Sequence, residues 1–170
     1  KRLSVHALMD DAVFETVAGG RGREFGTRVH DFAEAYADGK KATPSNEDER
    51  NVCDFLDGLD GEFRTEVDAF LPLGNDDGDD RTILVGIVDL LVVTDERIRI
   101  VDYKTDLGRH AESEYAKQLS VYYHVIASVY PDRVVSTEVF YTAEGVRQEV
   151  DPIGLTAIAD LVSGVDPLRD

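Results

Sequence analysis

The sequence predicts an α/β domain whose mixed central β-sheet of about five strands is flanked by α-helices. Some segments carry apolar residues at every third or fourth position, as amphipathic helices do, whereas others alternate polar and apolar residues or are continuously apolar, as strands do. In chain order they give helices, a meander of three strands, a helix, two strands and a last helix, which is typical of the α/β class. The 170 residues suit one domain, which we expect to span the chain from 1 to 170.

The N-terminal part is predicted to contain a helix from about 23 to 38. Its apolar stripe ends at Gly39, and His30 lies beside that stripe. A histidine on a helix is most often a surface or core-edge residue, so its position alone does not indicate a ligand. The apolar residues of the first twenty positions fit either a strand or a short helix, and the glycines between 19 and 22 indicate a loop.

A second helix is expected after Ser45, which forms a loose capping box with Asp48. Gly58 or Gly61 would end it. The chain's one cysteine, Cys53, lies within this helix, so no internal disulfide and no multi-cysteine metal site can form.

The strand meander begins with residues 63–73, which alternate in polarity and include Glu66 and Asp68. Residues 81–94 are almost continuously apolar, which predicts a central strand buried on both faces. After a turn, residues 98–103 form the third strand, on which alternate residues share a face.

The acidic segment 74–80 joins the first two strands of the meander. It superficially resembles a calcium-binding loop, but the 12-residue spacing that ends in glutamate is absent. We therefore expect a solvated hairpin turn.

The C-terminal part contains a long apolar-striped helix over 113–130 and two strands, at 134–142 and 146–150. A last helix is predicted to run from an N-cap at Asp151 to about residue 162.

The charge of the chain is strongly negative. Thirty-five acidic residues against 18 basic ones give a net charge of −17. Such a surface repels phosphate at low salt, although a screening length of roughly 3 Å at 1 M salt would nearly remove that repulsion. The acidic, lysine-poor composition is similar to that of proteins from halophiles, whereas the plainer interpretation is an acidic protein with no nucleic-acid partner.

The sequence also bears on where the protein acts. It contains no apolar run long enough to span a membrane and no signal peptide at its start, so we expect a cytoplasmic protein without a membrane partner. Because the chain begins at Lys1 rather than at a methionine, we expect it to be part of a longer protein.

Three charged residues mark the predicted site. Asp89 interrupts the central strand, and Asp102 and Lys104 lie at the end of the next strand, where they share a face. Two buried carboxylates would repel each other unless a divalent cation bound both, and a nearby lysine suits metal-assisted phosphodiester hydrolysis. The structural alternative is an Asp102–Lys104 ion pair at a sheet edge, with Asp89 satisfied by a backbone N–H.

Four separated motifs give the pattern its specificity. In chain order they are Gly26–His30 (GTRVH), Gly86–Leu91 (GIVDLL), Ile100–Thr105 (IVDYKT) and Gln118–Tyr122 (QLSVY). Their sequence and order closely resemble the RecB-like branch of the PD-(D/E)xK nuclease superfamily. The resemblance covers about residues 21–145 and implies a restriction-endonuclease-like core.

The resemblance also implies roles for individual residues. His30, Asp89 and Asp102 would bind Mg²⁺ or Mn²⁺, with the backbone carbonyl of Tyr103 as a further ligand, and Lys104 would be the catalytic lysine. Two residues of the long helix, Gln118 and Tyr122, would line the site and contact DNA or orient the lysine. Glu66 is the weakest candidate, as a secondary acid. Some relatives bind an iron–sulfur cluster through four cysteines, which the single Cys53 excludes here.

The activity implied is that of a metal-dependent DNA nuclease. Relatives often form the C-terminal domain of a UvrD-like helicase, so we expect an exonuclease that acts with a helicase in DNA repair or recombination. Such a helicase could deliver the strand and compensate for weak DNA binding by the acidic surface. Basic residues near the motifs could form a local track for DNA; they are Arg21, Arg23, Arg28, Lys104, Arg109 and Lys117.

Two other functions remain open at this stage. One is a catalytically silent docking or DNA-binding module of a helicase. The presence of Asp89, Asp102, Lys104 and Gln118 argues against it, because a silent domain has no chemical need for all four. The other is a metal-dependent hydrolase of small phosphoesters, which the polar loop over 105–114 does not decide.

Overall fold

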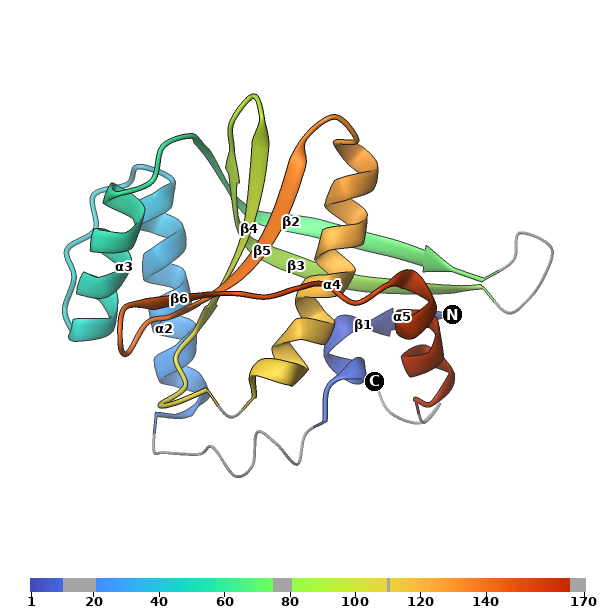
Figure 1. The fold of residues 1–170 in the computed structure, drawn as a ribbon. Coiled ribbons are helices and arrows are strands. Elements are labelled where there is room, and N and C mark those ends of the chain that lie inside the picture. Colours follow the sequence, from blue (N-terminus) through green and yellow to red (C-terminus); the bar gives the residue numbers. More distant parts are fainter. Residues whose placement is uncertain (11–20, 75–80, 110, 166–170) are drawn as a thin grey trace.

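The computed structural model describes residues 1–10, 21–74, 81–109 and 111–165. Within these ranges a twisted β-sheet lies between two helical layers (Figure 1). The predicted α/β class with a mixed sheet is therefore confirmed. Most of the acidic segment 74–80 and part of the loop at 19–22 lie outside the described residues.

The sheet has six strands among the described residues, one more than predicted. They are β1 (Arg2–Ser4), β2 (Glu62–Leu73), β3 (Thr82–Val93), β4 (Arg97–Lys104), β5 (Val134–Tyr141) and β6 (Val146–Glu149). The predicted meander is present because β3 pairs antiparallel with both β2 and β4. In contrast, β1 runs parallel to β3, and β5 runs parallel to β4.

The N-terminal segment contains both a strand and a short helix, the two alternatives that its sequence allows. After β1 the chain turns into a short 3₁₀ helix, η1 (Val5–Leu8). Leu3 and Val5 are buried, so this segment belongs to the core. A strand of three residues is too short for alternation to identify it.

The predicted burial of β3 on both faces is correct only for its second half. The residues from Leu90 to Val93 are all buried, but Ile83 and Ile87 are exposed. The first half therefore has one face in the core and one face in solvent, although its sequence is continuously apolar.

The helices agree with the prediction except at two N-termini. They are α2 (Gly22–Ala37), α3 (Glu47–Asp57), α4 (Glu112–Val129) and α5 (Leu155–Ser163). The N-cap of α3 is Asn46, not Ser45, because the Asn46 side chain accepts the backbone N–H of Glu49 at 2.8 Å. In return the side-chain amide of Asn46 donates to the Glu49 carboxylate at 2.7 Å, so a side-chain variant of the predicted capping box lies one residue later than predicted.

The last helix begins at Leu155 rather than after Asp151. The intervening segment is held against α4 by the backbone of Ile153. Its N–H donates to the Ser120 hydroxyl at 2.9 Å, and its carbonyl lies 2.8 Å from Nε2 of His124. A helix starting at Asp151 would need the Ile153 carbonyl to accept an N–H from the next turn, whereas here that carbonyl is engaged by His124, and the segment is not helical.

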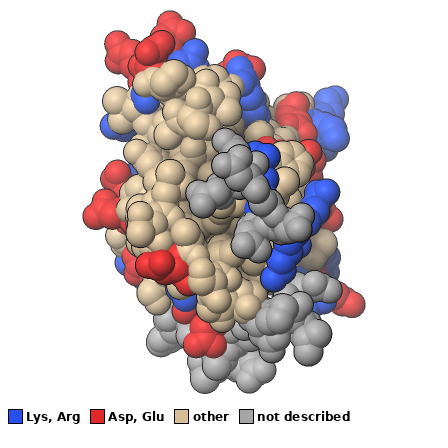
Figure 2. Space-filling view, turned by 90° about the vertical axis from the view of Figure 1, so that its right-hand side faces the viewer, with Lys and Arg blue, Asp and Glu red and all other residues tan. Residues whose placement is uncertain are grey.

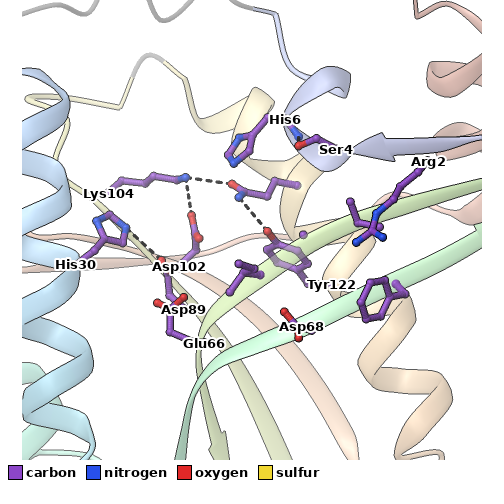
Figure 3. A pocket seen from close by; sticks show the side chains of 15 residues that line it. Arg2, Ser4, His6, His30, Glu66, Asp68, Asp89, Asp102, Lys104 and Tyr122 are labelled. Atoms are coloured by element: carbon purple, nitrogen blue, oxygen red, sulfur yellow. Dashed lines mark hydrogen bonds and ion pairs between the residues drawn. The ribbon is translucent and has the colours of Figure 1, made fainter. Parts of the chain in front are cut away.

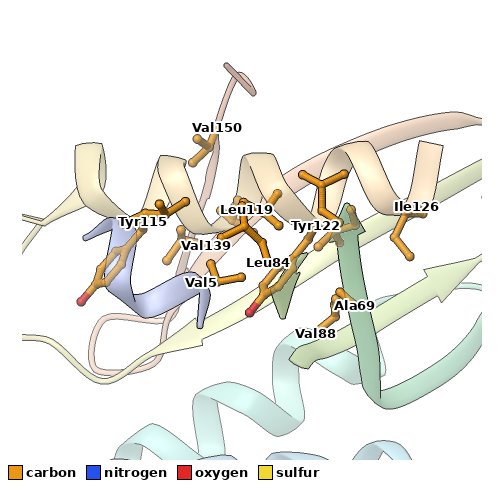
Figure 4. Close-up of a cluster of buried hydrophobic side chains, with 14 of the residues drawn as sticks. Val5, Ala69, Leu84, Val88, Tyr115, Leu119, Tyr122, Ile126, Val139 and Val150 are labelled. Carbon is orange, nitrogen blue, oxygen red and sulfur yellow. The ribbon is translucent and has the colours of Figure 1, made fainter. Parts of the chain in front are cut away.

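Two apolar clusters hold the layers together. The larger one lies between α4, η1 and the sheet, where Leu119, Tyr122 and Ile126 pack against residues of β3 (Figure 4). The smaller one joins α2 and α3 to the other side of the sheet through residues such as Val29 and Leu56. Burying each such side chain contributes about 1.5–3 kcal/mol. None of the described helices has the length and apolar character needed to cross a membrane.

Candidate active site

The candidate site lies where the central strand lacks a partner on one edge. On that edge β1 pairs with Ile83–Val85 and β4 pairs with Leu90–Val93, so the stretch Gly86–Asp89 between them is unpaired. A cavity of about 470 Å³ occupies this gap. Figure 3 shows that the predicted site residues point into it. The lining comprises Arg2, Ser4, His6, His30, Glu66, Asp68, Phe70, Val85, Gly86, Ile87, Asp89, Asp102, Lys104, Gln118 and Tyr122.

Asp89 enters the cavity at a point where β3 changes the side that it presents to the core. In a regular strand, residues that face the same side are an even number of positions apart. Val88 and Leu91 belong to the same apolar cluster although they are three residues apart, so the alternation of side chains along β3 shifts by one residue between them. Opposite Asp89 in the β2–β3 register lies Glu66, which has a left-handed backbone with φ of 50°. A non-glycine residue with this backbone is strained, which is common at functional sites. The irregularity places both carboxylates at the cavity.

Helix α2 brings His30 to the same carboxylate. Its Nδ1 lies 2.8 Å from the carbonyl oxygen of Gly26, and its Nε2 lies 3.3 Å from Oδ2 of Asp89. Burial disfavours the charged imidazole, but the hydrogen bond and the charge of Asp89 outweigh burial and raise the pKa of His30 to about 9. The metal-free site therefore holds a protonated histidine beside Asp89.

Asp102 is almost completely buried and has a raised pKa. Its Oδ2 lies 2.8 Å from Nζ of Lys104 but has no partner in hydrogen-bonding geometry. Burial raises the pKa of Asp102 to about 6 against the opposing effect of Lys104, and the charge of Asp89 adds to the rise. The ammonium group of Lys104 therefore offsets the cost of burying this carboxylate only in part.

Helix α4 orients the lysine through two residues one turn apart. Nζ of Lys104 donates to Oε1 of Gln118 at 3.0 Å, and Nε2 of Gln118 donates to the hydroxyl of Tyr122 at 3.1 Å. Tyr122 fits because position 86 is glycine: a Cβ there would lie 2.9 Å from both the Tyr122 ring and Val5. The chain Tyr122–Gln118–Lys104 fixes the ammonium group at the cavity.

The two contacts of the structural alternative are also present. The ion pair between Asp102 and Lys104 exists, and the backbone N–H of Tyr103 donates to Oδ2 of Asp89 at 2.9 Å. They do not account for the cavity, the raised pKa of Asp102 or the placement of His30 and Gln118. The role of the Tyr103 carbonyl remains a prediction.

The donor set suits a divalent cation, although it is not preassembled. Among the described residues, no three His, Cys, Asp or Glu side chains are already arranged to hold an ion. The chemistry nevertheless fits, because a buried carboxylate oxygen lacks a hydrogen bond and a second carboxylate shares its cavity. Carboxylate oxygens are the ligands that Mg²⁺ and Mn²⁺ prefer, whereas imidazole suits transition-metal ions better than Mg²⁺. Asp89, Asp102 and His30 are the residues that would hold the ion.

Several residues that line the cavity were not predicted from the sequence. Arg2, Ser4 and His6 enter from β1 and η1, on the side opposite Glu66 and Asp68 (Figure 3). Burial, followed by the charge of Lys104, lowers the pKa of His6. The pairing of β1 with β3 brings this segment to the site, and no local pattern in the sequence predicts that pairing.

The predicted basic track is partly neutralised. Arg21 forms an ion pair with Asp48 at 2.5 Å, and Lys117 forms one with Glu114 at 2.6 Å. Cations that are already paired with carboxylates contribute less to phosphate binding.

Comparisons with known proteins bear on the family and the fold. The family model described as the PD-(D/E)XK nuclease superfamily matches residues 56–162, which include β2, β3, β4 and α4. The crystal structure of SSO0001 has a similar fold, with a TM-score of 0.55 at 11% sequence identity, over 95% of this chain and 73% of that one. No curated protein is matched by sequence.

Proposed function

The chain belongs to the PD-(D/E)XK nuclease superfamily, and we propose that it hydrolyses phosphodiester bonds of DNA in the cavity between β1 and β4. The observation that carries this proposal is the convergence of Asp89, Asp102 and Lys104 on one cavity. The lysine is oriented there by Gln118 and the first carboxylate is contacted by His30.

A divalent ion, Mg²⁺ or Mn²⁺, would polarise the phosphoryl oxygen and lower the pKa of a bound water. Asp89 and Asp102 would supply the carboxylates, with His30 and the Tyr103 carbonyl completing the set. His30 must release its proton to act as a ligand, so the affinity for the ion should rise with pH.

Lys104 would act on the substrate directly. Its ammonium group is held by Gln118 and lies beside Asp102, so it can contact the scissile phosphate and stabilise negative charge as that charge develops. A charge fixed in advance by the protein needs little reorganisation during the reaction, which is why the Tyr122–Gln118–Lys104 chain matters for the rate.

The finer assignment is an exonuclease that works with a helicase in DNA repair or recombination, as the RecB-like motifs suggest. The net charge of −17 supports this partnership, because an acidic domain gains little affinity for DNA from phosphate contacts. A helicase in the same chain or complex would supply the strand at a high effective concentration. The same charge and the scarcity of lysine support an origin in a salt-rich cell.

The test is cleavage of end-labelled single- and double-stranded DNA with Mg²⁺, Mn²⁺ or a chelator, at low and at molar salt. We expect metal-dependent cleavage by the parent protein and none by Lys104→Ala or Asp102→Ala. Lack of metal-dependent cleavage under every condition, including with the helicase partner present, would favour a catalytically silent DNA-binding or docking module. Equal cleavage by the parent and the variants would place the activity elsewhere.

A further inference from the structure

One face of the β2–β3 hairpin carries exposed apolar side chains and reaches the cavity that the two acids line. Along β3, Ile83 and Ile87 are four residues apart and share the face opposite the apolar cluster under α4, and Ile87 lines the same cavity as Asp89. Phe70 on β2 pairs with Val85 between them. This face therefore joins the candidate catalytic acids to the outer end of the β2–β3 hairpin.

The exposure of these side chains is high for their size. Phe70 is 52% exposed and Ile87 is 50% exposed. Both line the same cavity as Asp89 and Asp102. The apolar strip formed by Ile83, Phe70 and Ile87 is therefore continuous with the candidate active site. Contiguous exposed apolar surface of this kind marks a binding site more often than isolated apolar residues do.

The charges around the strip indicate which part of a ligand it accepts. The guanidinium of Arg2 lies 5.8 Å from the centroid of the Phe70 ring, on the β1 side. On the other side, Asp68 is paired with Ile87, and Glu66 follows toward the acids. Carboxylates beside the strip repel a phosphate, so the apolar surface suits the uncharged face of a base, whereas Arg2 can hold a neighbouring phosphate.

We propose that Phe70 and Ile87 form a stacking subsite for a nucleobase of single-stranded DNA, with Arg2 at its edge. The inference rests on the proposed nuclease function and names its substrate class. In a duplex both faces of a base are covered by neighbouring bases, so only an unstacked base can lie against Phe70. Aromatic stacking is a recurrent way of holding single strands because every base has a π-face.

The overall charge explains why stacking is needed. A protein with a net charge of −17 gains little from displacing counterions from DNA. Figure 2 views the end of the molecule that carries the hairpin and β1; much of the described surface there is uncharged, and Lys and Arg gather along one side. A contact with the base itself persists in molar salt, where phosphate contacts are screened.

The test measures binding without cleavage, in the Lys104→Ala background, with a short single strand that contains 2-aminopurine. Its fluorescence falls when the base stacks on an aromatic ring. We expect quenching at one position of the strand in molar salt. Phe70→Ala should abolish that quenching and weaken binding about tenfold, and Phe70→Tyr should retain both.

A matched control removes an exposed apolar side chain elsewhere. Leu155→Ala on α5 affects a residue that is 48% exposed and lies outside the cavity lining, and it should leave binding unchanged. An abasic residue at the sensitive position should weaken binding by the Lys104→Ala protein as much as Phe70→Ala does, and should add no further loss when both changes are combined.

The outcomes separate this inference from the proposed function. If the parent cleaves DNA but Phe70→Ala binds and quenches as the background protein does, the stacking subsite is wrong while the nuclease assignment stands. If the parent neither binds nor cleaves DNA, both proposals fail. Quenching that depends on Phe70 in a parent that does not cleave would support the subsite and contradict the catalytic assignment.

Discussion

Two groups of buried charges in this protein differ in how well they are satisfied. Glu138 on β5 is fully buried, and both of its carboxylate oxygens are engaged by arginines: Nε of Arg99 lies 2.7 Å from Oε1 and Nε of Arg147 lies 2.6 Å from Oε2. Asp102 is also buried, but its Oδ2 has only the ion pair with Lys104 at 2.8 Å, which lies outside hydrogen-bonding geometry, and it faces a cavity.

The difference separates a structural role from a functional one. A buried charge whose partners are all supplied by the protein leaves no free position for a ligand. A buried charge that lacks a full set of protein partners lowers the stability of the fold. Such a charge is typical of functional sites, where a ligand supplies the missing partner. We therefore expect substitutions at the two groups to have opposite effects on stability and on activity.

The largest expected effect is on catalysis at the incomplete group. Asp102→Asn should lower metal-dependent DNA cleavage by about 10³-fold or more, because a metal ligand contributes several kcal/mol to transition-state stabilisation. The same change should leave the unfolding free energy at pH 8 unchanged or raised. The pKa of Asp102 is raised in the folded protein, so its ionisation above about pH 6 opposes folding, and asparagine removes that cost. Cleavage rates measure the effect on catalysis, and denaturant unfolding measures the effect on stability. A large loss of stability in Asp102→Asn would contradict the prediction.

The satisfied group should behave in the opposite way. Glu138→Gln leaves Arg99 without a countercharge and Arg147 with only its 3.9 Å contact to Glu149, and should lower the unfolding free energy by about 2–4 kcal/mol. The half-exposed Arg147 keeps access to water, which limits the loss. Cleavage per folded molecule should stay at the parent level. A selective loss of activity with unchanged stability would mean that this group also serves the site.

The third prediction concerns the proton that His30 carries in the metal-free protein. Asp89→Asn removes the two largest effects that raise the pKa of His30 to about 9, so this pKa should fall, because burial is then opposed only by the Gly26 carbonyl and the charge of Asp102. NMR titration of the imidazole in the presence of a chelator measures it. An unchanged pKa would mean that the two residues do not interact in solution.

The same pair predicts a dependence of stability on pH. Its contribution through His30 is complete below about pH 6.5 and is lost as the pH rises through about 9. The pKa of Asp89 is lowered by His30 despite burial, so its contribution is present above about pH 3.8 and is lost at lower pH. The stability difference between the parent and Asp89→Asn should therefore be largest between these limits. A difference that is flat from pH 4 to pH 10 would contradict the ion pair.

The smallest expected effect concerns the support of the site. Gly86→Ala places a Cβ 2.9 Å from Tyr122 and Val5, which should lower the unfolding free energy by about 1–3 kcal/mol. Displacement of Tyr122 should also loosen Gln118 and Lys104, so the cleavage rate should fall while the affinity for metal is retained. Gly154→Ala is a matched control because nothing lies within 4 Å of the Cβ it would gain. Equal effects of the two changes would show that close packing at Gly86 is unimportant.

The fold could be predicted from the sequence where the pattern of side chains is local. The helical stripes, the three-strand meander and the strands after α4 follow from periodicity. The N-cap of α5 could not be predicted, because Ser120 and His124 hold the backbone of Ile153 from a helix some thirty residues earlier. Asp151 followed by proline is a valid start signal that this contact overrides.

The site could be predicted only in part. The acids and Lys104 lie on neighbouring strands, so the hairpin alone places them together, whereas the approach of His30 was implied only by the family resemblance. The contribution of Arg2 and His6 depends on a parallel pairing about eighty residues apart in sequence, and the exposure of Phe70 and Ile87 depends on which face the bent hairpin turns outward. Neither is encoded in a local pattern.

The most direct test of the central claim is a Mn²⁺ titration followed by electron paramagnetic resonance, in molar potassium chloride to screen the acidic surface. The parent and Glu138→Gln, compared under conditions where both are folded, should each bind Mn²⁺ at the cavity, and Asp102→Asn should lose that binding. Equal binding by the parent and Asp102→Asn would show that the incomplete carboxylate is not a metal ligand and would contradict the account.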